Sequence, residues 1–177
     1  MLGILLNDTS YEQDIRELMM AFYPGESFAH EKQDDVTFYI EGIYADAGSA
    51  EDCDVSLEGA TGTFTLRVID NGEVQEECSF PLDYRNRLEA KTTIKRELYE
   101  LLSARTGIVL PWGTLTGIRP TKIALTRLDE GWKEEDIKAF MRDTYLTSEE
   151  KIELSVEIAS REKELLSALF NRSNSNK

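Results

Sequence analysis

Residues 64–80, FTLRVIDNGEVQEECSF, decide the fold of the first half of the chain. Apolar and polar residues alternate on both sides of Asp70-Asn71-Gly72, which is typical of two antiparallel strands joined by a tight turn. A two-residue loop would place Val68 and Val74 on opposite faces of the sheet. We therefore predict a three-residue loop over residues 70–72, in which Gly72 is left-handed and Val68 faces Val74.

The segments before this hairpin have the same mixed α and β character. Residues 2–6 form a short apolar run, and Thr9 with Glu12 forms a capping box before a helix that ends at Pro24-Gly25. Residues 36–40 and 53–57 alternate with period two and predict further half-buried strands. We expect a small, mainly antiparallel sheet and one helix in this half.

The second half is predicted to be a helical cluster, so the fold class is α+β. One amphipathic helix is expected over residues 87–105, ended by Gly107. Shorter helices are expected over residues 121–128 and 134–141, and a last helix begins at Ser148.

The last helix carries two apolar stripes, roughly 120° apart around its axis. The first is Leu154, Ile158, Leu165 and Leu169, and the second is Ile152, Val156, Ala159, Leu166 and Phe170. Two interpretations remain open: one wide stripe buried in a single helical cluster, or a further piece of protein that covers one of the stripes.

Charge divides the chain in the same way. The 177 residues have a formal net charge of −14, and residues 1–84 hold 3 basic and 19 acidic side chains against 17 and 15 in residues 85–177. We predict an acidic α/β subdomain over residues 1–84, a helical subdomain over residues 85–170, and a flexible polar tail over residues 171–177. Residues 85–127 form the one basic segment of an acidic protein.

Reactive side chains are few. Cys53, Cys78 and His30 are the only cysteines and histidine, and their spacing supplies neither a metal site nor a nucleophile with its base. We predict no catalytic and no metal-binding residue. No stretch has the length of a membrane span or the pattern of a secretion signal, so we expect a cytoplasmic protein without a membrane partner.

The most informative segment is residues 111–122, PWGTLTGIRPTK. Its glycines allow close backbone approach, Arg119 can bind a carboxylate or phosphate with two hydrogen bonds, and Pro120 begins the next helix. The candidates for substrate or interdomain contacts are Trp112, Gly113, Thr116, Gly117, Arg119, Pro120, Lys122 and Arg127. In the alternative, Trp112 and Ile118 fill the junction between the two halves and Arg119 pairs with an acidic residue of the first half.

Residues 112–122, followed by Tyr145-Leu146 and Glu150-Lys151, resemble the N-terminal region of HemZ-type oxygen-independent coproporphyrinogen III oxidase-like proteins, which are radical S-adenosylmethionine enzymes. The resemblance is strongest over residues 105–161. It implies an accessory domain that precedes a radical SAM barrel, in which a Cys-x-x-x-Cys-x-x-Cys motif binds a [4Fe–4S] cluster. This chain lacks that motif, so the cluster and S-adenosylmethionine would belong to the parent, an oxidoreductase of porphyrin and haem biosynthesis. The chain would be a truncated piece, with residues 171–177 leading toward the catalytic domain.

The resemblance also implies partners. The chain would pack on its own C-terminal barrel, and Arg119, Lys122 and Arg127 would face anionic groups: propionates of a tetrapyrrole substrate, the carboxylate of S-adenosylmethionine, or acidic residues of the barrel. Two other classes stay open. One is an interaction or scaffold module without ligand contact, and the isolated chain would then self-associate through the last helix because the barrel is missing. The other is a nucleic-acid-binding domain, against which stand the net charge and the acidic residues 134–136.

Overall fold

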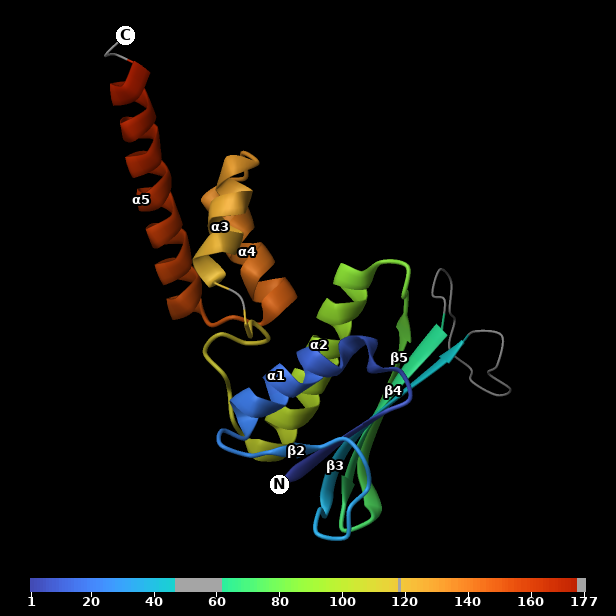
Figure 1. Ribbon diagram of the computed structural model, residues 1–177. Coiled ribbons are helices and arrows are strands. Elements are labelled where there is room, and N and C mark those ends of the chain that lie inside the picture. Colours follow the sequence, from blue (N-terminus) through green and yellow to red (C-terminus); the bar gives the residue numbers. More distant parts are fainter. Residues whose placement is uncertain (47–61, 118, 175–177) are drawn as a thin grey trace. The chain divides into compact units, whose positions relative to one another are not determined.

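The computed structural model describes residues 1–46, 62–117 and 119–174, and the chain divides into two compact units. Unit 1 comprises Met1–Ile108 and unit 2 comprises Val109–Lys177. Strands lie in unit 1, and three of the helices lie in unit 2, so the predicted α+β class is confirmed (Figure 1). The predicted strand over residues 53–57 lies outside the described residues.

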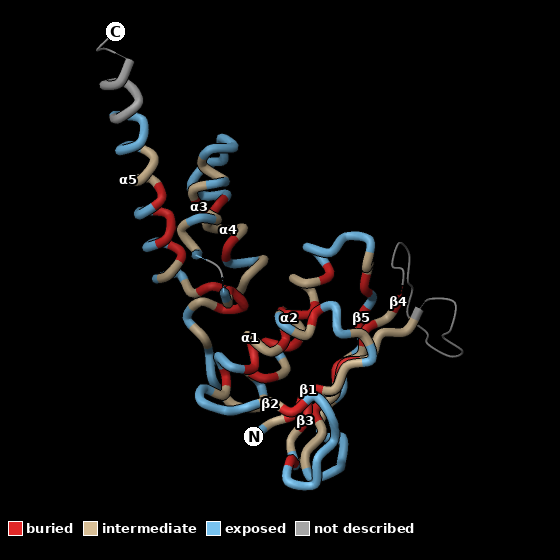
Figure 2. Tube along the Cα trace, in the orientation of Figure 1, coloured by how far each residue is buried: buried red, intermediate tan, exposed pale blue. Residues whose placement is uncertain are grey.

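Unit 1 is built on a mixed sheet with the strand order β2-β1-β3-β4-β5. Strand β1 runs parallel to its two neighbours, β2 and β3, whereas the pairs β3–β4 and β4–β5 are antiparallel, as predicted. Helices α1 and α2 supply most of the other buried apolar residues of this unit (Figure 2). The bounds are β1 (Leu2–Leu6), α1 (Glu12–Phe22), β2 (Phe28–Ala29), β3 (Phe38–Asp46), β4 (Gly62–Asp70), β5 (Glu73–Leu82) and α2 (Arg87–Thr106).

Helix α2 belongs with the sheet. Its residues Ile94, Leu98 and Leu102 are fully buried, and the helix contacts both α1 and β5. It ends at Gly107, which has a φ of 70°, as its sequence predicts. The boundary inferred from charge, after residue 84, differs from this division because a charge count does not register which surface an amphipathic helix buries.

The hairpin of β4 and β5 has a different turn from the one predicted. Asp70 pairs with Glu73, so the loop is the two-residue Asn71-Gly72, and both loop residues have positive φ. The register shifts next to this turn: Val68 pairs with Glu76, and the extra residue lies in β5 as a bulge. The predicted three-residue loop and the pairing of Val68 with Val74 are therefore wrong. The bulge keeps the apolar residues of β4 buried, while Val74 is 54% exposed.

The first helix also begins differently. A short 3-10 turn, Thr9–Tyr11, precedes α1, and the Asp8 carboxylate accepts a hydrogen bond from the Ser10 amide at 2.8 Å. Asp8 therefore caps this turn in place of the predicted cap, Thr9.

Unit 2 is a cluster of three helices, α3 (Pro120–Asp129), α4 (Glu134–Tyr145) and α5 (Glu149–Asn174). Helix α5 continues to Asn174, and the flexible tail predicted over residues 171–177 stays a prediction. Figure 1 shows α5 extending beyond the ends of the two shorter helices. The core comprises Leu115, Ala124, Ile137, Met141, Ile152, Val156 and Ala159.

Candidate functional site

The turn over residues 111–115 is fastened to the connection between α4 and α5. The Thr114 amide donates a hydrogen bond to the Tyr145 carbonyl at 2.8 Å, and the Ser148 amide donates one to the Pro111 carbonyl at 3.0 Å. The Thr114 hydroxyl also donates to the Tyr145 carbonyl, at 3.3 Å. We call this arrangement of residues 111–115 and 145–148 the clip. It joins the two segments on which the sequence resemblance rests.

Gly113 is the residue that allows the clip to close. It is buried with a φ of 57°, and a Cβ atom added there would lie 2.0 Å from the Tyr145 carbonyl oxygen. The close approach that Gly113 permits is therefore to the chain's own backbone. Leu146, on the other side of the clip, is itself left-handed, with a φ of 55°.

Trp112 belongs to this clip, and its side chain packs against the core of unit 2. The Lys151 ammonium is 5.7 Å from the centre of its ring, within the range of a cation–π contact. Lys151 also pairs with Glu150 at 2.9 Å. Trp112, Tyr145-Leu146 and Glu150-Lys151, which the sequence analysis took together, are thus neighbours in the folded unit.

Two exposed cations follow the clip at the start of α3. Arg119 is the N-cap residue, Pro120 occupies the first turn, and Lys122 lies within that turn. Among the residues that the structure describes, neither the Arg119 guanidinium nor the Lys122 ammonium has an ion-pair partner within unit 2. The free amides at a helix N-terminus favour anions, so both charges lie where an anionic group would be stabilised. Ile118 lies outside the described residues.

The Arg127 guanidinium, unlike the charged groups of Arg119 and Lys122, already has an ion-pair partner within unit 2. This guanidinium pairs with Glu130 at 2.7 Å and lies 4.7 Å and 4.8 Å from the ring centres of Trp132 and Phe140. Arg127 and Lys122 nevertheless line one open groove of about 540 Å³. The other residues that line this groove are Ile123, Thr126, Glu130 and Tyr145.

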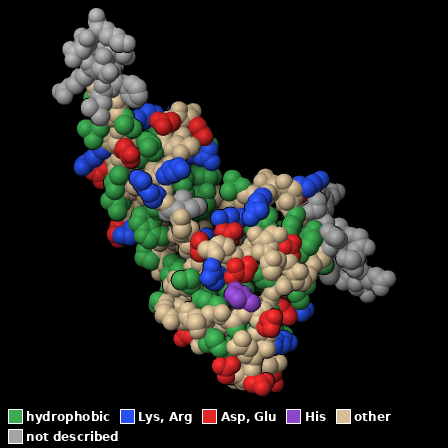
Figure 3. Space-filling model, in the orientation of Figure 1, with side chains coloured by type: hydrophobic (Ala, Val, Ile, Leu, Met, Phe, Trp, Pro, Cys, Tyr) green, Lys and Arg blue, Asp and Glu red, His purple; other side chains and the backbone are tan. Residues whose placement is uncertain are grey.

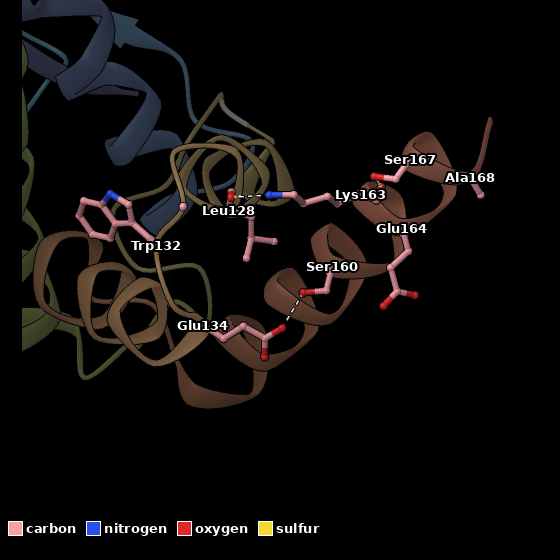
Figure 4. Close-up of a pocket in the computed structure, with 9 residues that line it drawn as sticks. Leu128, Trp132, Glu134, Ser160, Lys163, Glu164, Ser167 and Ala168 are labelled. Atoms are coloured by element: carbon pink, nitrogen blue, oxygen red, sulfur yellow. Dashed lines mark hydrogen bonds between the residues drawn. The ribbon is translucent and has the colours of Figure 1, made fainter. Parts of the chain in front are cut away.

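A second hollow, of about 680 Å³, lies between the end of α3 and the outer half of α5 (Figure 4). Its polar groups hold helices together. Ser160 donates a hydrogen bond to Glu134 at 2.7 Å, and the Lys163 ammonium donates to the Leu128 carbonyl at the end of α3. A cation at a helix C-terminus stabilises that end, so the side chains in this hollow already have structural roles. These contacts leave no pattern in the sequence, because each joins residues of different helices.

The two stripes of α5 have different surroundings. Ile152, Val156 and Ala159 of one stripe are buried in the core, whereas Leu166 of the same stripe is 46% exposed. On the other stripe, the side chains are largely exposed, with fractions of 41% for Leu154, 42% for Ile158 and 67% for Leu165. The interpretation of a single wide stripe buried in one helical cluster is therefore wrong. In the face drawn in Figure 3, hydrophobic side chains reach the surface along α5.

The basic segment, residues 85–127, does not stay together as one surface. It is divided between the two units, and many of its cations have acidic partners: Arg85 with Asp83, Lys91 with Asp14, Arg96 with Glu100, Arg105 with Asp70 and Glu76, and Arg127 with Glu130. On the face drawn in Figure 3, Lys and Arg side chains lie among Asp and Glu side chains.

Lys95 is a buried cation that the sequence analysis did not single out. The residue is only 3% exposed on α2, and burial, with the nearby Lys91 charge, lowers the pKa of its ammonium to about 8. Asp14 and Glu17 act in the opposite direction and raise that pKa. In the sequence, Lys95 is simply the neighbour of the apolar Ile94, and nothing in the helical spacing indicates that its side chain is buried. The aliphatic part of that side chain is covered only because α1 packs on α2.

Within residues 1–46, 62–117 and 119–174, no three His, Cys, Asp or Glu side chains are grouped as metal ligands would be. None of the described helices combines the length and the hydropathy of a membrane span.

Comparison with known proteins links the chain to oxygen-independent coproporphyrinogen-III oxidase-like proteins. The relative is HemZ of Bacillus subtilis (strain 168), which is 43% identical to this chain over 74 residues. Those residues are 42% of this chain and 15% of HemZ, so the chain matches a small part of the relative's length. No family model matches the chain, and no solved structure matches it. The resemblance to HemZ-type proteins is confirmed.

Proposed function

We propose that this chain is the accessory region of a radical S-adenosylmethionine protein of the coproporphyrinogen III oxidase-like type, which acts in porphyrin and haem biosynthesis in the cytoplasm. The observation that carries the proposal is the 43% identity to HemZ over 74 residues. The chain is not catalytic alone. The cluster and S-adenosylmethionine bind to the catalytic barrel of the parent protein, on which this region packs. The cysteines of this chain, Cys53 and Cys78, are too few for the three-cysteine cluster motif.

The clip and the start of α3 have the role of presenting positive charge to the substrate entrance. Gly113 and its hydrogen bonds fix residues 111–115 on the core, which in turn fixes where α3 begins. Arg119 and Lys122 then point exposed cations toward anionic groups, either the carboxylates of a tetrapyrrole or acidic side chains of the barrel. Because Arg127 is paired with Glu130, we assign it to the support of this surface.

The proposal is tested with the full product of the gene that encodes this chain. After anaerobic reconstitution with iron and sulfide, we expect the full product to form a [4Fe–4S] cluster and to cleave S-adenosylmethionine in the presence of coproporphyrinogen III. The 177-residue chain, treated identically, should form no cluster. A full product that forms no cluster, or whose cleavage of S-adenosylmethionine ignores the porphyrinogen, would contradict the proposed function.

The second candidate is an interaction module without ligand contact, which the exposed stripe of α5 favours. In this second candidate, Arg119 and Lys122 contact no substrate, whereas in the first they do. Substitution of both residues therefore distinguishes the two candidate functions. A nucleic-acid-binding role has less support, because the basic segment is divided between the units and largely paired with carboxylates.

A further inference from the structure

The outer face of α5 has an organised pattern of charge as well as exposed apolar side chains. At about 100° per residue, Leu154, Ile158 and Leu165 fall within about 40° of each other. Along one flank of this stripe run four exposed glutamates, Glu150, Glu153, Glu157 and Glu164. We call these four residues the acidic ridge.

Helix α5 cannot turn to bury this stripe in its own unit. Its opposite face carries Ile152, Val156 and Ala159 in the core, and the hydrogen bonds of Ser160 to Glu134 and of Lys163 to Leu128 fasten the helix to α4 and α3. Rotation would expose the core residues and break both hydrogen bonds. The exposed stripe is therefore a fixed feature of unit 2, and exposed apolar side chains aligned on one face of a helix are typical of an interaction site.

We infer that the stripe and the acidic ridge form the docking face of this region for the catalytic domain, and that they meet an apolar surface flanked by Lys or Arg side chains on that domain. The inference rests on the proposed function and names the surface that makes the interdomain contact. The rim of such a contact selects its partner by charge, so a ridge of carboxylates requires a basic counterpart.

Charge also argues against a second copy of this chain as the occupant. In a two-fold antiparallel pair of α5 helices, the two acidic ridges lie on the same side and face each other. Each copy carries a net charge of −14, which adds a long-range repulsion. Glu150 and Glu157 are neutralised only by exposed pairs with Lys151 and Arg161, which contribute little.

Hydrogen–deuterium exchange on the full gene product tests the inference. We expect the amides of residues 152–166 to exchange at least about tenfold more slowly in the full product than in the 177-residue chain, because docking suppresses local opening of the helix. The variant E150K/E157K/E164K should lose that protection. The matched control, E31K/D34K/D35K, reverses three exposed carboxylates of unit 1 and should keep it.

Three results would overturn the inference. They are equal exchange of α5 in the two proteins, protection that survives the triple reversal on α5, and protection that grows with protein concentration together with a dimer mass in light scattering, which would assign the face to a second copy. Failure here is distinct from failure of the proposed function. Substrate-dependent cleavage of S-adenosylmethionine with unprotected α5 removes only the inference, whereas protected α5 in a product that forms no cluster removes only the proposed function.

Discussion

Gly113 provides the sharpest test of the clip, through the substitution Gly113→Ala. The added Cβ would lie 2.0 Å from the Tyr145 carbonyl oxygen and 2.5 Å from two backbone atoms of Leu146, so the backbone itself must move. That movement breaks the hydrogen bond from the Thr114 amide to the Tyr145 carbonyl, which costs about 1 kcal/mol of free energy. The left-handed conformation costs alanine about 1–2 kcal/mol more. With the loss of packing around Trp112, we expect the free energy of unfolding of unit 2 to fall by about 3–4 kcal/mol.

The assay is urea unfolding followed by tryptophan fluorescence. Both tryptophans of the chain, Trp112 and Trp132, lie in unit 2, so this signal reports on that unit alone. Gly131→Ala is the matched control, since Gly131 has a φ of 86° but no atom within 4 Å of an added Cβ. The control carries the conformational strain without the collision, and we expect it to cost about 1–2 kcal/mol.

The comparison of the two variants decides the matter. If G113A destabilises unit 2 no more than G131A does, the collision with Tyr145 is not real and the clip does not hold residues 111–115 in place. A large loss in both variants would show that strain, and not the close approach of the two backbone segments, is what glycine relieves.

Two further predictions concern charged side chains. In the full gene product, R119A/K122A should lower kcat/KM for the porphyrinogen by about tenfold, an effect of about 1.4 kcal/mol. The control K133A, which removes another exposed cation of unit 2, should leave kcat/KM unchanged. Equal kcat/KM in both variants would favour the interaction module without ligand contact. For the buried Lys95, the folded-state pKa of about 8 lies below the ordinary 10.5, so the unfolded state binds more protons between these pH values and stability rises with pH. K95M should therefore stabilise unit 1 by roughly 1–3 kcal/mol at pH 7, as measured by hydrogen exchange of the α2 amides. This gain should disappear as the pH approaches 10.5. A gain that does not depend on pH would contradict the lowered pKa of Lys95.

Local pattern predicted most of the elements and missed what depends on distant contacts. The alternation in β4 and the left-handed Gly107 at the end of α2 are properties of neighbouring residues, and both were predicted correctly. The alternation of side chains between the two faces of the sheet correctly required one extra residue in the hairpin. Whether that residue lies in the turn or as a bulge in β5 depends on which side chains the helices cover.

The candidate site shows the same division. The sequence identified residues 111–122 and both segments that meet in the clip, but not that Gly113 approaches the Tyr145 carbonyl, because the two residues are far apart along the chain. The partners of Arg127 include Phe140 on another helix, so its side chain could not be recognised as occupied from residues 119–127 alone. The two stripes of α5 are visible as a pattern in the sequence, and only the packed core shows that Ile152, Val156 and Ala159 are the buried residues.

The central claim is that this region assists a catalytic domain of the same protein. The most direct measurement compares the full gene product with a version that lacks residues 1–177, both reconstituted anaerobically and matched for cluster content. We predict that the shortened protein keeps its cluster and loses most of its coproporphyrinogen-dependent cleavage of S-adenosylmethionine. Equal cleavage by the two proteins at every substrate concentration would contradict the account.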